Sequence, residues 1–500
     1  MDSGVVLSIG IYMAGMLLIG YLAYRRTANL NDYMLGGRNL GPAVTALSAG
    51  ASDMSGWLLM GLPGAMFVSG LSAGWIVVGL TAGAWLNWLF VAPRLRTYTE
   101  VANNSITIPD YFDNRFKDHS RILRVTSALV ILIFFTFYTS SGMVAGGELF
   151  KSAFHLDYRW GIWLTASVVI LYTLFGGFLA VSWTDFVQGT IMFIALILVP
   201  IVTIANIGGW TETFSEIRSI DPTLLEAFKG TSFIGIISLL AWGLGYFGQP
   251  HIIVRFMAIT SVKEMKSARR IGMGWMIFSI VGAMFTGLVG IAYFSIENMK
   301  LPNEETVFIV LSDVLFPSLI TGFLLAAILA AVMSTIASQL LVTSSAITED
   351  FYKAFFRKNA SDKELVLVGR LAVLGIALIA LVMALNPSKT ILNLVGYAWA
   401  GFGAAFGPVV LLSLYWKRMT KWGALAGMIG GTLTVIIWEQ IPLPFFKEVY
   451  EIIPGFIVCA AAIAVTSLLT AKPSQDMENE FDEAVRMLTG EKSNDKALPL

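Results

Sequence analysis

The side chains with the clearest chemistry lie inside long apolar stretches of the sequence. Asp53 falls in the segment ASDMSGW, and Ser334 and Thr335 are adjacent hydroxyls in an otherwise apolar run that begins at Leu324. Ionisable groups in apolar spans are costly and usually functional. We therefore expect Asp53 to act in binding or coupling, although a carboxylate that caps a broken helix would also fit the pattern.

The hydroxyl pair has two interpretations. Hydroxyls in membrane helices usually bond to their own helix or to a neighbouring one. A hard cation, however, needs several oxygen ligands, and unwound backbone carbonyls beside two hydroxyls would supply them. An alkali-cation site at Ser334 and Thr335 therefore requires that their segment lie against the segment around Asp53.

Four aromatic residues accompany these groups. Tryptophans and tyrosines in membrane proteins usually belong to the interfacial belts. Two of the four instead fall in mid-stretch beside glycines, where a small solute could stack on a ring or place a cationic amine over it. The four residues are Trp57, Tyr138, Trp242 and Tyr246, and the two in mid-stretch are Trp57 and Trp242.

Composition excludes most other classes of protein. Hydrophobic residues make up 56% of the 500 residues and charged residues only 13%, about half the usual charged share. The 33 basic and 33 acidic residues balance, so no basic field predicts nucleic-acid binding. One cysteine, Cys459, and three scattered histidines make no metal cluster. We expect a membrane protein that is not an enzyme and needs no cofactor.

Apolar stretches of the length that crosses a bilayer, about 20 residues, recur along the chain and predict about thirteen transmembrane helices. The expected fold class is an all-α polytopic membrane protein, with one transmembrane domain over 1–472 and a short cytoplasmic tail, a solvated helix, over 473–500. The predicted spans are 4–24, 42–64, 70–93, 123–148, 159–180, 186–206, 231–250, 273–295, 315–346, 367–386, 391–416, 421–440 and 451–471.

The distribution of basic residues predicts the orientation. With the N-terminus outside and the C-terminus in the cytoplasm, 26 of the 33 Lys and Arg residues lie on the cytoplasmic side. Such an excess marks cytoplasmic loops.

The second and seventh spans contain the most helix-breaking residues. The second reads LSAGASDMSGWLLMGLPGAM and the seventh reads AWGLGYFGQPH. Glycines in membrane helices often serve close packing, but these two spans also hold aromatic or ionisable groups. The two spans lie five apart and so cross in opposite directions, as broken helices do in inverted repeats. We expect spans two to six (about 42–206) and seven to eleven (about 231–416) to form the repeats.

A second acidic residue, Asp185, lies in GGFLAVSWTDFVQG near the predicted start of the sixth span. A carboxylate there would suit a helix N-terminus. A functional role and a simple capping role remain equally open for it.

Taken together, the segments ASDMSGWLLMGLPG, GGFLAVSWTDFVQ, LGYFGQPHIIVRFMAI and AAVMSTIASQLLV resemble the sodium/solute symporter family, and within it the bacterial members that transport proline. The resemblance runs from about residue 4 to 471. It implies a leucine-transporter-like fold of five plus five inverted helices.

The resemblance also implies roles for particular residues. Sodium would be held by the backbone carbonyls of Ala51, Met54 and Ala331 and the hydroxyls of Ser334 and Thr335, with Asp53 needed for coupling. The solute pocket and its gates would use Ser55, Trp57, Gly61, Tyr138, Trp242, Tyr246 and Pro250. Arg38 matches a sensitive cytoplasmic-side arginine. Ala337 departs from relatives that have a further hydroxyl there, which argues against a second sodium.

The function that follows from the resemblance is sodium-driven import of L-proline by alternating access across a bacterial cell membrane. Sodium would be the coupling ion, with no other cofactor, no nucleic acid and no obligatory protein partner. Another small solute, such as a different amino acid, a carboxylate or pantothenate, is the first alternative, and a membrane sensor with the same fold is a remote one.

Overall fold

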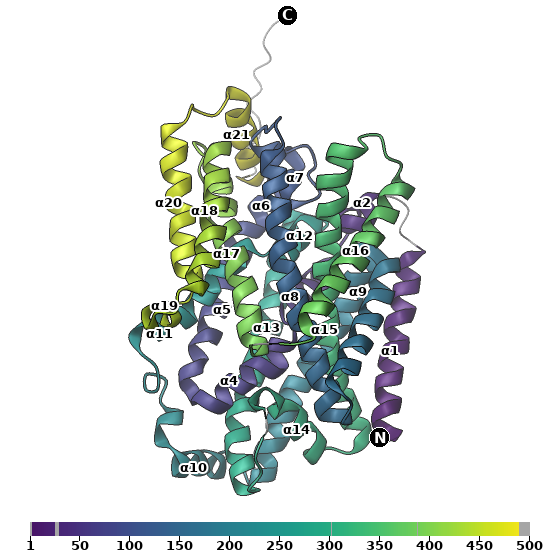
Figure 1. Ribbon diagram of the computed structural model, residues 1–500, viewed down its shortest axis with the longest axis vertical. Coiled ribbons are helices and arrows are strands. Elements are labelled where there is room, and N and C mark those ends of the chain that lie inside the picture. The colour runs from purple at the N-terminus through teal and green to yellow at the C-terminus, as the bar shows by residue number, and fades with distance from the viewer. Residues whose placement is uncertain (1–2, 26–29, 302, 388, 490–500) are drawn as a thin grey trace, which may run out of the picture.

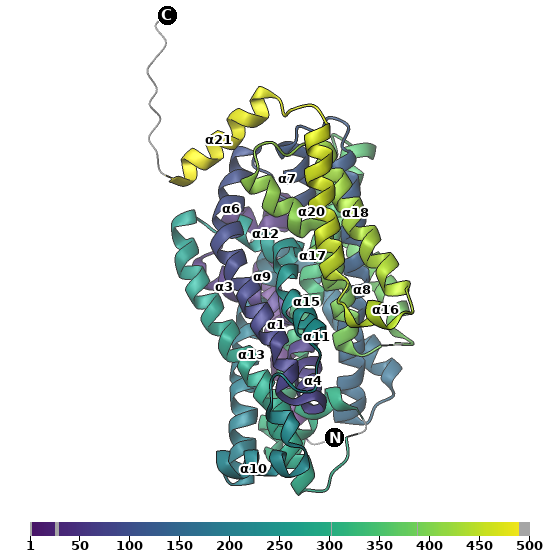
Figure 2. The same ribbon diagram turned by 90° about the vertical axis from the view of Figure 1, so that its left-hand side faces the viewer.

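A computed structural model describes residues 3–25, 30–301, 303–387 and 389–489. Figures 1 and 2 show long helices running roughly along one axis, with α1 beginning near one end of the molecule and α21 lying at the other. The described residues form no strand beyond an isolated bridge between Leu40 and Ile259. The expected all-helical fold class is confirmed.

The bounds of the α-helices follow from the backbone hydrogen bonds. They are α1 (Ser3–Tyr24), α2 (Leu30–Leu35), α3 (Pro42–Asp53), α4 (Leu62–Ser69), α5 (Trp75–Leu86), α6 (Ala92–Val101), α7 (Ile108–Arg115), α8 (Ile122–Phe154), α9 (Tyr158–Ile207), α10 (Trp210–Ile220), α11 (Phe233–Leu240), α12 (Pro250–Ala258), α13 (Met265–Ile296), α14 (Val307–Leu315), α15 (Ser318–Ser345), α16 (Asp362–Ala384), α17 (Ile391–Tyr415), α18 (Lys421–Gln440), α19 (Pro444–Glu448), α20 (Ile452–Leu469) and α21 (Gln475–Thr489).

Within the described residues, ten helices are long and apolar enough to cross a membrane, or eleven if one bent pair counts as a single span. The predicted count of thirteen is therefore not confirmed. The predicted second span is broken into short pieces, and its latter part continues into a stretch over Trp57–Val101. The predicted fifth span contains only the shorter apolar helix Tyr158–Leu171.

The two expected broken helices are present. The first ends at Asp53, where α3 stops and a wide π-type turn, η2 (Trp57–Gly61), leads into α4. The second is the pair of helices around η6 (Ala241–Gly248), a 3₁₀ segment between α11 and α12, with a bend of 44°.

The glycines of the second broken helix serve close packing. A Cβ on Gly243 would lie 2.2 Å from the carbonyl oxygen of Gly79 in α5, and one on Gly245 would lie 1.9 Å from the Trp399 indole nitrogen in α17. Small residues let membrane helices approach this closely. The glycines that helped to locate the break thus also fix the contact of η6 with α5 and α17.

A further break, which the sequence analysis did not predict, divides α9 at Gly177. This residue has φ +60°, and an added Cβ would lie 2.7 Å from the Tyr33 ring. Glycine is the residue that adopts such a backbone conformation without strain. Because α9 continues on both sides of Gly177, no separate loop divides the predicted fifth and sixth spans.

The remaining helices flank this arrangement. α1 packs against α9 and α15 on one side, and α18 and α20 pack against each other and against α17 on the other (Figure 1).

The tail helix α21 differs from the solvated helix that we expected. It packs against α6, and its Met477, Phe481 and Ala484 side chains are buried. Residues 490–500 of the predicted tail lie outside the described residues.

Candidate functional site

The break after α3 releases one backbone carbonyl from the helical ladder. The amide N–H of Ser55 donates to the carbonyl of Asp53 at 3.0 Å, so it does not continue the ladder to Ala51. Met54, which ends the helix, has φ −82° and ψ 82°. All four of these residues are buried. The Ala51 carbonyl is therefore an oxygen ligand in the protein interior that needs a partner.

The two hydroxyls of α15 face this carbonyl. Ser334 Oγ donates to the Ala51 oxygen at 2.7 Å, and Thr335 Oγ1 lies 3.4 Å from the same oxygen. Ser334 Oγ also lies 3.1 Å from the carbonyl oxygen of Ala331. The proximity that a cation site requires is thus present, and it brings together four of the predicted ligand residues. Two carbonyl and two hydroxyl oxygens, all shielded from water, form the neutral donor set that suits a monovalent cation.

Asp53, two residues after Ala51, binds one tyrosine through its side chain. Its Oδ2 accepts a hydrogen bond from the Tyr246 hydroxyl at 2.5 Å. Its Oδ1 has no hydrogen-bond partner among the described residues, although Asp53 is only 1% exposed. Burying a carboxylate is costly unless it is paired, so this side chain is poised to interact with a charged or polar partner.

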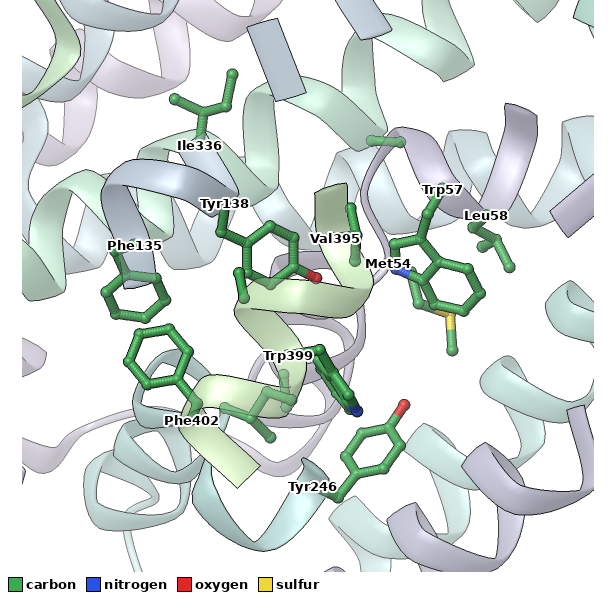
Figure 3. Close-up of a cluster of buried hydrophobic side chains, with 14 of the residues drawn as sticks. Met54, Trp57, Leu58, Phe135, Tyr138, Tyr246, Ile336, Val395, Trp399 and Phe402 are labelled. Atoms are coloured by element: carbon green, nitrogen blue, oxygen red, sulfur yellow. The ribbon is translucent and has the colours of Figure 1, made fainter. Parts of the chain in front are cut away.

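Three of the predicted pocket aromatics converge on the same residue. The backbone carbonyl of Asp53 accepts from the Tyr138 hydroxyl at 3.2 Å and from Trp57 Nε1 at 3.1 Å, while Tyr246 holds the side chain. Figure 3 shows Trp57, Tyr138 and Tyr246 in one cluster of buried side chains, with Trp399 of α17 beside Tyr246. The residues at the break therefore connect the oxygen cluster to this aromatic cluster.

Trp242 is connected to this pocket through Trp399. The Trp399 indole N–H donates to the Trp242 carbonyl at 2.7 Å, and its ring meets Tyr246 edge to face at 5.1 Å between centroids. The Trp242 ring stacks instead on Tyr450, at 5.2 Å. The sequence analysis missed Trp399, although its position in mid-span among glycines is the same signal that singled out Trp57 and Trp242.

The other predicted pocket residues lie at the two breaks. Ser55 Oγ is 3.5 Å from the backbone nitrogen of Trp57. Gly61 ends the wide turn of the first break, where a Cβ would lie 3.2 Å from the Cβ of Leu392. Pro250 begins α12, directly after the second break.

The structure overturns the capping interpretation of Asp185. The residue lies well inside α9, not at a helix start, and is fully buried. Its Oδ2 accepts from Ser48 Oγ at 2.7 Å and from Arg255 Nη2 at 3.2 Å. Arg255, in α12, also donates to Ser338 Oγ at 2.6 Å. The buried ion pair thus joins α3, α9, α12 and α15.

Arg255 lies beyond the predicted seventh span, 231–250, but it belongs to the buried helix α12 and not to a loop. Its guanidinium is fully buried and donates to the carbonyl of His251 as well as to the Asp185 cluster. Nothing in the local sequence distinguishes a buried arginine near a helix end from a loop arginine, since only the partner from α9 makes burial tolerable.

Arg38 lies on the same side of the two breaks as this ion pair. Its guanidinium donates to the carbonyls of Met257 and Ser105, each at 2.7 Å, and to Thr99 Oγ1 at 3.2 Å. Burial lowers the pKa of Arg38 to about 10, which still leaves it charged at neutral pH. Arg38 therefore ties the start of α3 to the end of α12.

Several curated proteins are similar to this chain over nearly its whole length. The high-affinity proline transporter PutP of Bacillus subtilis is 67% identical, with 94% of this chain and 98% of the relative covered. The osmoregulated proline transporter OpuE of the same species is 60% identical (98% and 100%). The sodium/proline symporter of Escherichia coli is 58% identical (95% of each chain).

Two solved structures show the same fold at low sequence identity. A Na+-coupled sialic acid symporter has a TM-score of 0.80 and 21% identity, with 95% of this chain and 99% of that chain covered. The nucleobase-cation-symport-1 transporter Mhp1 has a TM-score of 0.58 and 12% identity, with 91% and 99% covered. The leucine-transporter-like architecture expected from the sequence is confirmed.

The model of one protein family, the sodium:solute symporter family, matches residues 33–431, which include both broken helices and the Ser334–Thr335 pair. The chain belongs to the sodium:solute symporter family.

Proposed function

We propose that this protein imports L-proline together with sodium by alternating access. The observation that carries the proposal is the meeting of the Ala51 carbonyl with Ser334 and Thr335, next to Asp53 and Tyr246. The choice of proline rests on three relatives of 58–67% identity whose names state that solute. These relatives match over almost their full length.

Sodium would bind where α3 ends against α15. The Ser334 and Thr335 hydroxyls would give up their present hydrogen bonds to Ala51 and direct oxygen lone pairs at the ion. The carbonyls of Ala51, Met54 and Ala331 would complete the ligand set. Asp53 would supply negative charge nearby without being a ligand. Sodium binding would thereby fix the end of α3.

Proline would bind on the other side of the break. Its compact ring would pack between the aromatic side chains, and its charged groups would meet backbone groups freed by the two broken helices. The pocket residues would be Ser55, Trp57, Gly61, Tyr138, Trp242, Tyr246 and Pro250.

Coupling would pass through Asp53, because this residue follows the proposed ligand Ala51 at the end of α3 and holds the pocket aromatics. Its backbone holds Tyr138 and Trp57, and its side chain holds Tyr246. A cation that orders the end of α3 would therefore position three pocket aromatics, and each ligand would strengthen binding of the other.

The protein would span a bacterial cell membrane with its N-terminus outside and its C-terminus in the cytoplasm. Spans two to six and seven to eleven would act as the inverted repeats. Arg38 and the Asp185–Arg255 pair, which lie on the proposed cytoplasmic side of the breaks, would hold that side closed. An inside-negative potential contributes about 2.3 kcal/mol per charge per 100 mV to sodium entry.

Purified protein in sealed proteoliposomes tests this proposal. An inward sodium gradient should drive accumulation of labelled proline, whereas an equal potassium gradient or a pH gradient should not. A panel of unlabelled amino acids, carboxylates and pantothenate identifies the solute by competition. Accumulation that is equal with potassium would contradict sodium coupling, and failure of unlabelled proline to compete would contradict the solute.

A further inference from the structure

A small cavity lies against the side chain of Asp53. Its volume is about 20 Å³, and α3, α5, η6, α12 and α13 contribute to its wall. Apart from Asp53 and Tyr246, the side chains around it are mostly apolar, with Trp88, Met273 and Met276 among them. One further polar side chain, Asn87, lines the same cavity.

Asn87 is a buried polar residue whose side chain has no partner in the described part of the protein. It is 1% exposed, and neither its Oδ1 nor its Nδ2 makes a hydrogen bond there. Asp53 Oδ1, on the wall of the same cavity, is in the same condition. A buried polar group without a partner costs about 1–3 kcal/mol, so three such atoms around one cavity indicate a shared ligand.

The backbone at Asn87 is also unusual. Asn87 begins a wide π-type turn, η4 (Asn87–Val91), in which the N–H of Ala92 bonds back to the Asn87 carbonyl. Such turns are rare and occur frequently at functional sites. The other wide turn of this region, η2, directly follows Asp53 and the first break. Two wide turns therefore flank the pair of unpartnered side chains.

The size and chemistry of the cavity select its ligand. One water molecule needs roughly 10–15 Å³ and two to four polar partners, and the cavity offers both. Proline is too large for it. A hard cation needs more oxygen ligands than the two unpartnered oxygens here, Asp53 Oδ1 and Asn87 Oδ1, whereas a water molecule can accept from the Asn87 amide N–H and donate to Asp53 Oδ1.

We propose that Asn87 is a positioning residue of the coupling site and holds one water molecule that bridges to Asp53 Oδ1. The carboxylate is then held at both oxygens, by Tyr246 at Oδ2 and by the bridging water at Oδ1. This inference rests on the proposed role of Asp53 in sodium coupling. It adds α5 to the helices that sense the cation.

Two substitutions with opposite expectations test the proposal. Asn87→Leu keeps the side-chain shape but removes both polar groups, and Asn87→Ser keeps a donor and an acceptor but loses volume. In proteoliposomes, Asn87→Leu should raise the sodium concentration for half-maximal proline uptake about fivefold, the effect of one lost hydrogen bond. For Asn87→Ser, the sodium concentration for half-maximal uptake should lie within about twofold of the wild-type value. The proline KM of both variants at saturating sodium should also lie within about twofold of wild type.

If Asn87 only fills space, Asn87→Ser should raise the sodium requirement more than Asn87→Leu does, because serine would leave a void that leucine fills. Leu86→Ala, at the neighbouring and 39% exposed position of α5, is the matched control and should leave the sodium dependence unchanged.

Asp53→Asn distinguishes failure of the proposed coupling role of Asp53 from failure of the positioning role of Asn87. If Asp53→Asn keeps the wild-type sodium dependence, the proposed role of Asp53 is wrong and the inference fails with it. If Asp53→Asn loses sodium dependence while Asn87→Leu retains it, or if leucine performs better than serine, the positioning role of Asn87 alone is overturned.

Discussion

At the scale of single residues, the hydroxyls of Ser334 and Thr335 support two states of one site. In the structure they satisfy the Ala51 carbonyl, which the broken helix leaves without its usual partner. The same oxygens have the lone pairs that a monovalent cation needs. Hydrogen bonding within the helices and cation binding, which the sequence presents as alternatives, are therefore compatible.

Thr335→Ala should raise the sodium concentration for half-maximal uptake about tenfold or more, because an oxygen that contacts a charge contributes about 1.5–3 kcal/mol. The measurement is initial proline uptake against sodium concentration. Thr343→Ala is the control, since that buried hydroxyl of α15 bonds only to the Gln339 carbonyl of its own helix. Equal curves for Thr335→Ala and wild type would rule out the cation site.

Glu451, just before α20, predicts a pH effect on stability. It lines a cavity of about 430 Å³ together with Lys389, Lys447 and Glu439. Burial, with a smaller effect of Glu439, raises the pKa of Glu451 to about 7 despite the two lysines. A raised carboxyl pKa means that the folded state prefers the protonated form, so stability falls as pH rises from about 4.5 to about 7.

Glu451→Gln removes this dependence. The variant should melt about 1–2 °C above wild type at pH 8, and the difference should be much smaller at pH 5, close to the ordinary carboxyl pKa at which the effect begins. Thermal melts of the purified protein at both pH values measure this. A difference of the same size at pH 5 and pH 8 would show that Glu451 does not titrate in this range.

At the scale of elements, the tail helix α21 is anchored to α6 and its neighbours by buried apolar residues, of which Phe481 is the largest, and by several ion pairs. The Phe481 ring lies 6.1 Å from the Tyr98 ring and 5.3 Å from the Arg115 guanidinium carbon. Lys417 pairs with Asp482 at 2.7 Å, and Lys117 pairs with Glu480. Exposed ion pairs contribute little, so the buried ring should decide whether the helix stays docked.

Phe481→Ala should therefore release the tail. Trypsin cleavage at Arg486, followed by mass spectrometry, should become at least about tenfold faster, because loss of a buried aromatic ring costs several kcal/mol. Met487→Ala removes a large residue of the same helix that is 55% exposed, and it should cleave at the wild-type rate. Cleavage of Phe481→Ala at the wild-type rate would mean that the ring does not anchor the tail.

At the scale of the whole molecule, the helices place the first and last described elements at opposite ends (Figures 1 and 2). A single buried cysteine makes the orientation easy to measure. Cys459 is fully buried, so a membrane-impermeant maleimide should not label the wild-type protein.

In a Cys459→Ala background, Ser3→Cys should label from outside intact cells and Gln475→Cys only in inverted vesicles. This outcome follows from the excess of Lys and Arg in the predicted cytoplasmic loops. Both original residues are exposed, so access depends on the side of the membrane alone. Labelling of Gln475→Cys in intact cells would reverse the proposed orientation.

The membrane class and the two broken helices could be predicted from the sequence alone, and Asp53, Ser334 and Thr335 could be singled out as candidates. These features depend on local properties, namely the length of apolar stretches, helix-breaking residues and costly groups in apolar surroundings. The number of spans was less certain, because a broken helix such as α3 and an abrupt break at Gly177 alter where one span ends and the next begins.

Only the tertiary structure decided which distant residues meet. Asp185 and Arg255 are 70 positions apart, Trp242 and Trp399 are 157 apart, and Thr335 and Ala51 are 284 apart. The local sequence can single out such residues, as it does for Asp185, Trp242 and Thr335, but it does not identify the partner of each. Their roles arise because helices that are far apart in the chain bury the same polar atoms, and burial requires those atoms to find one another.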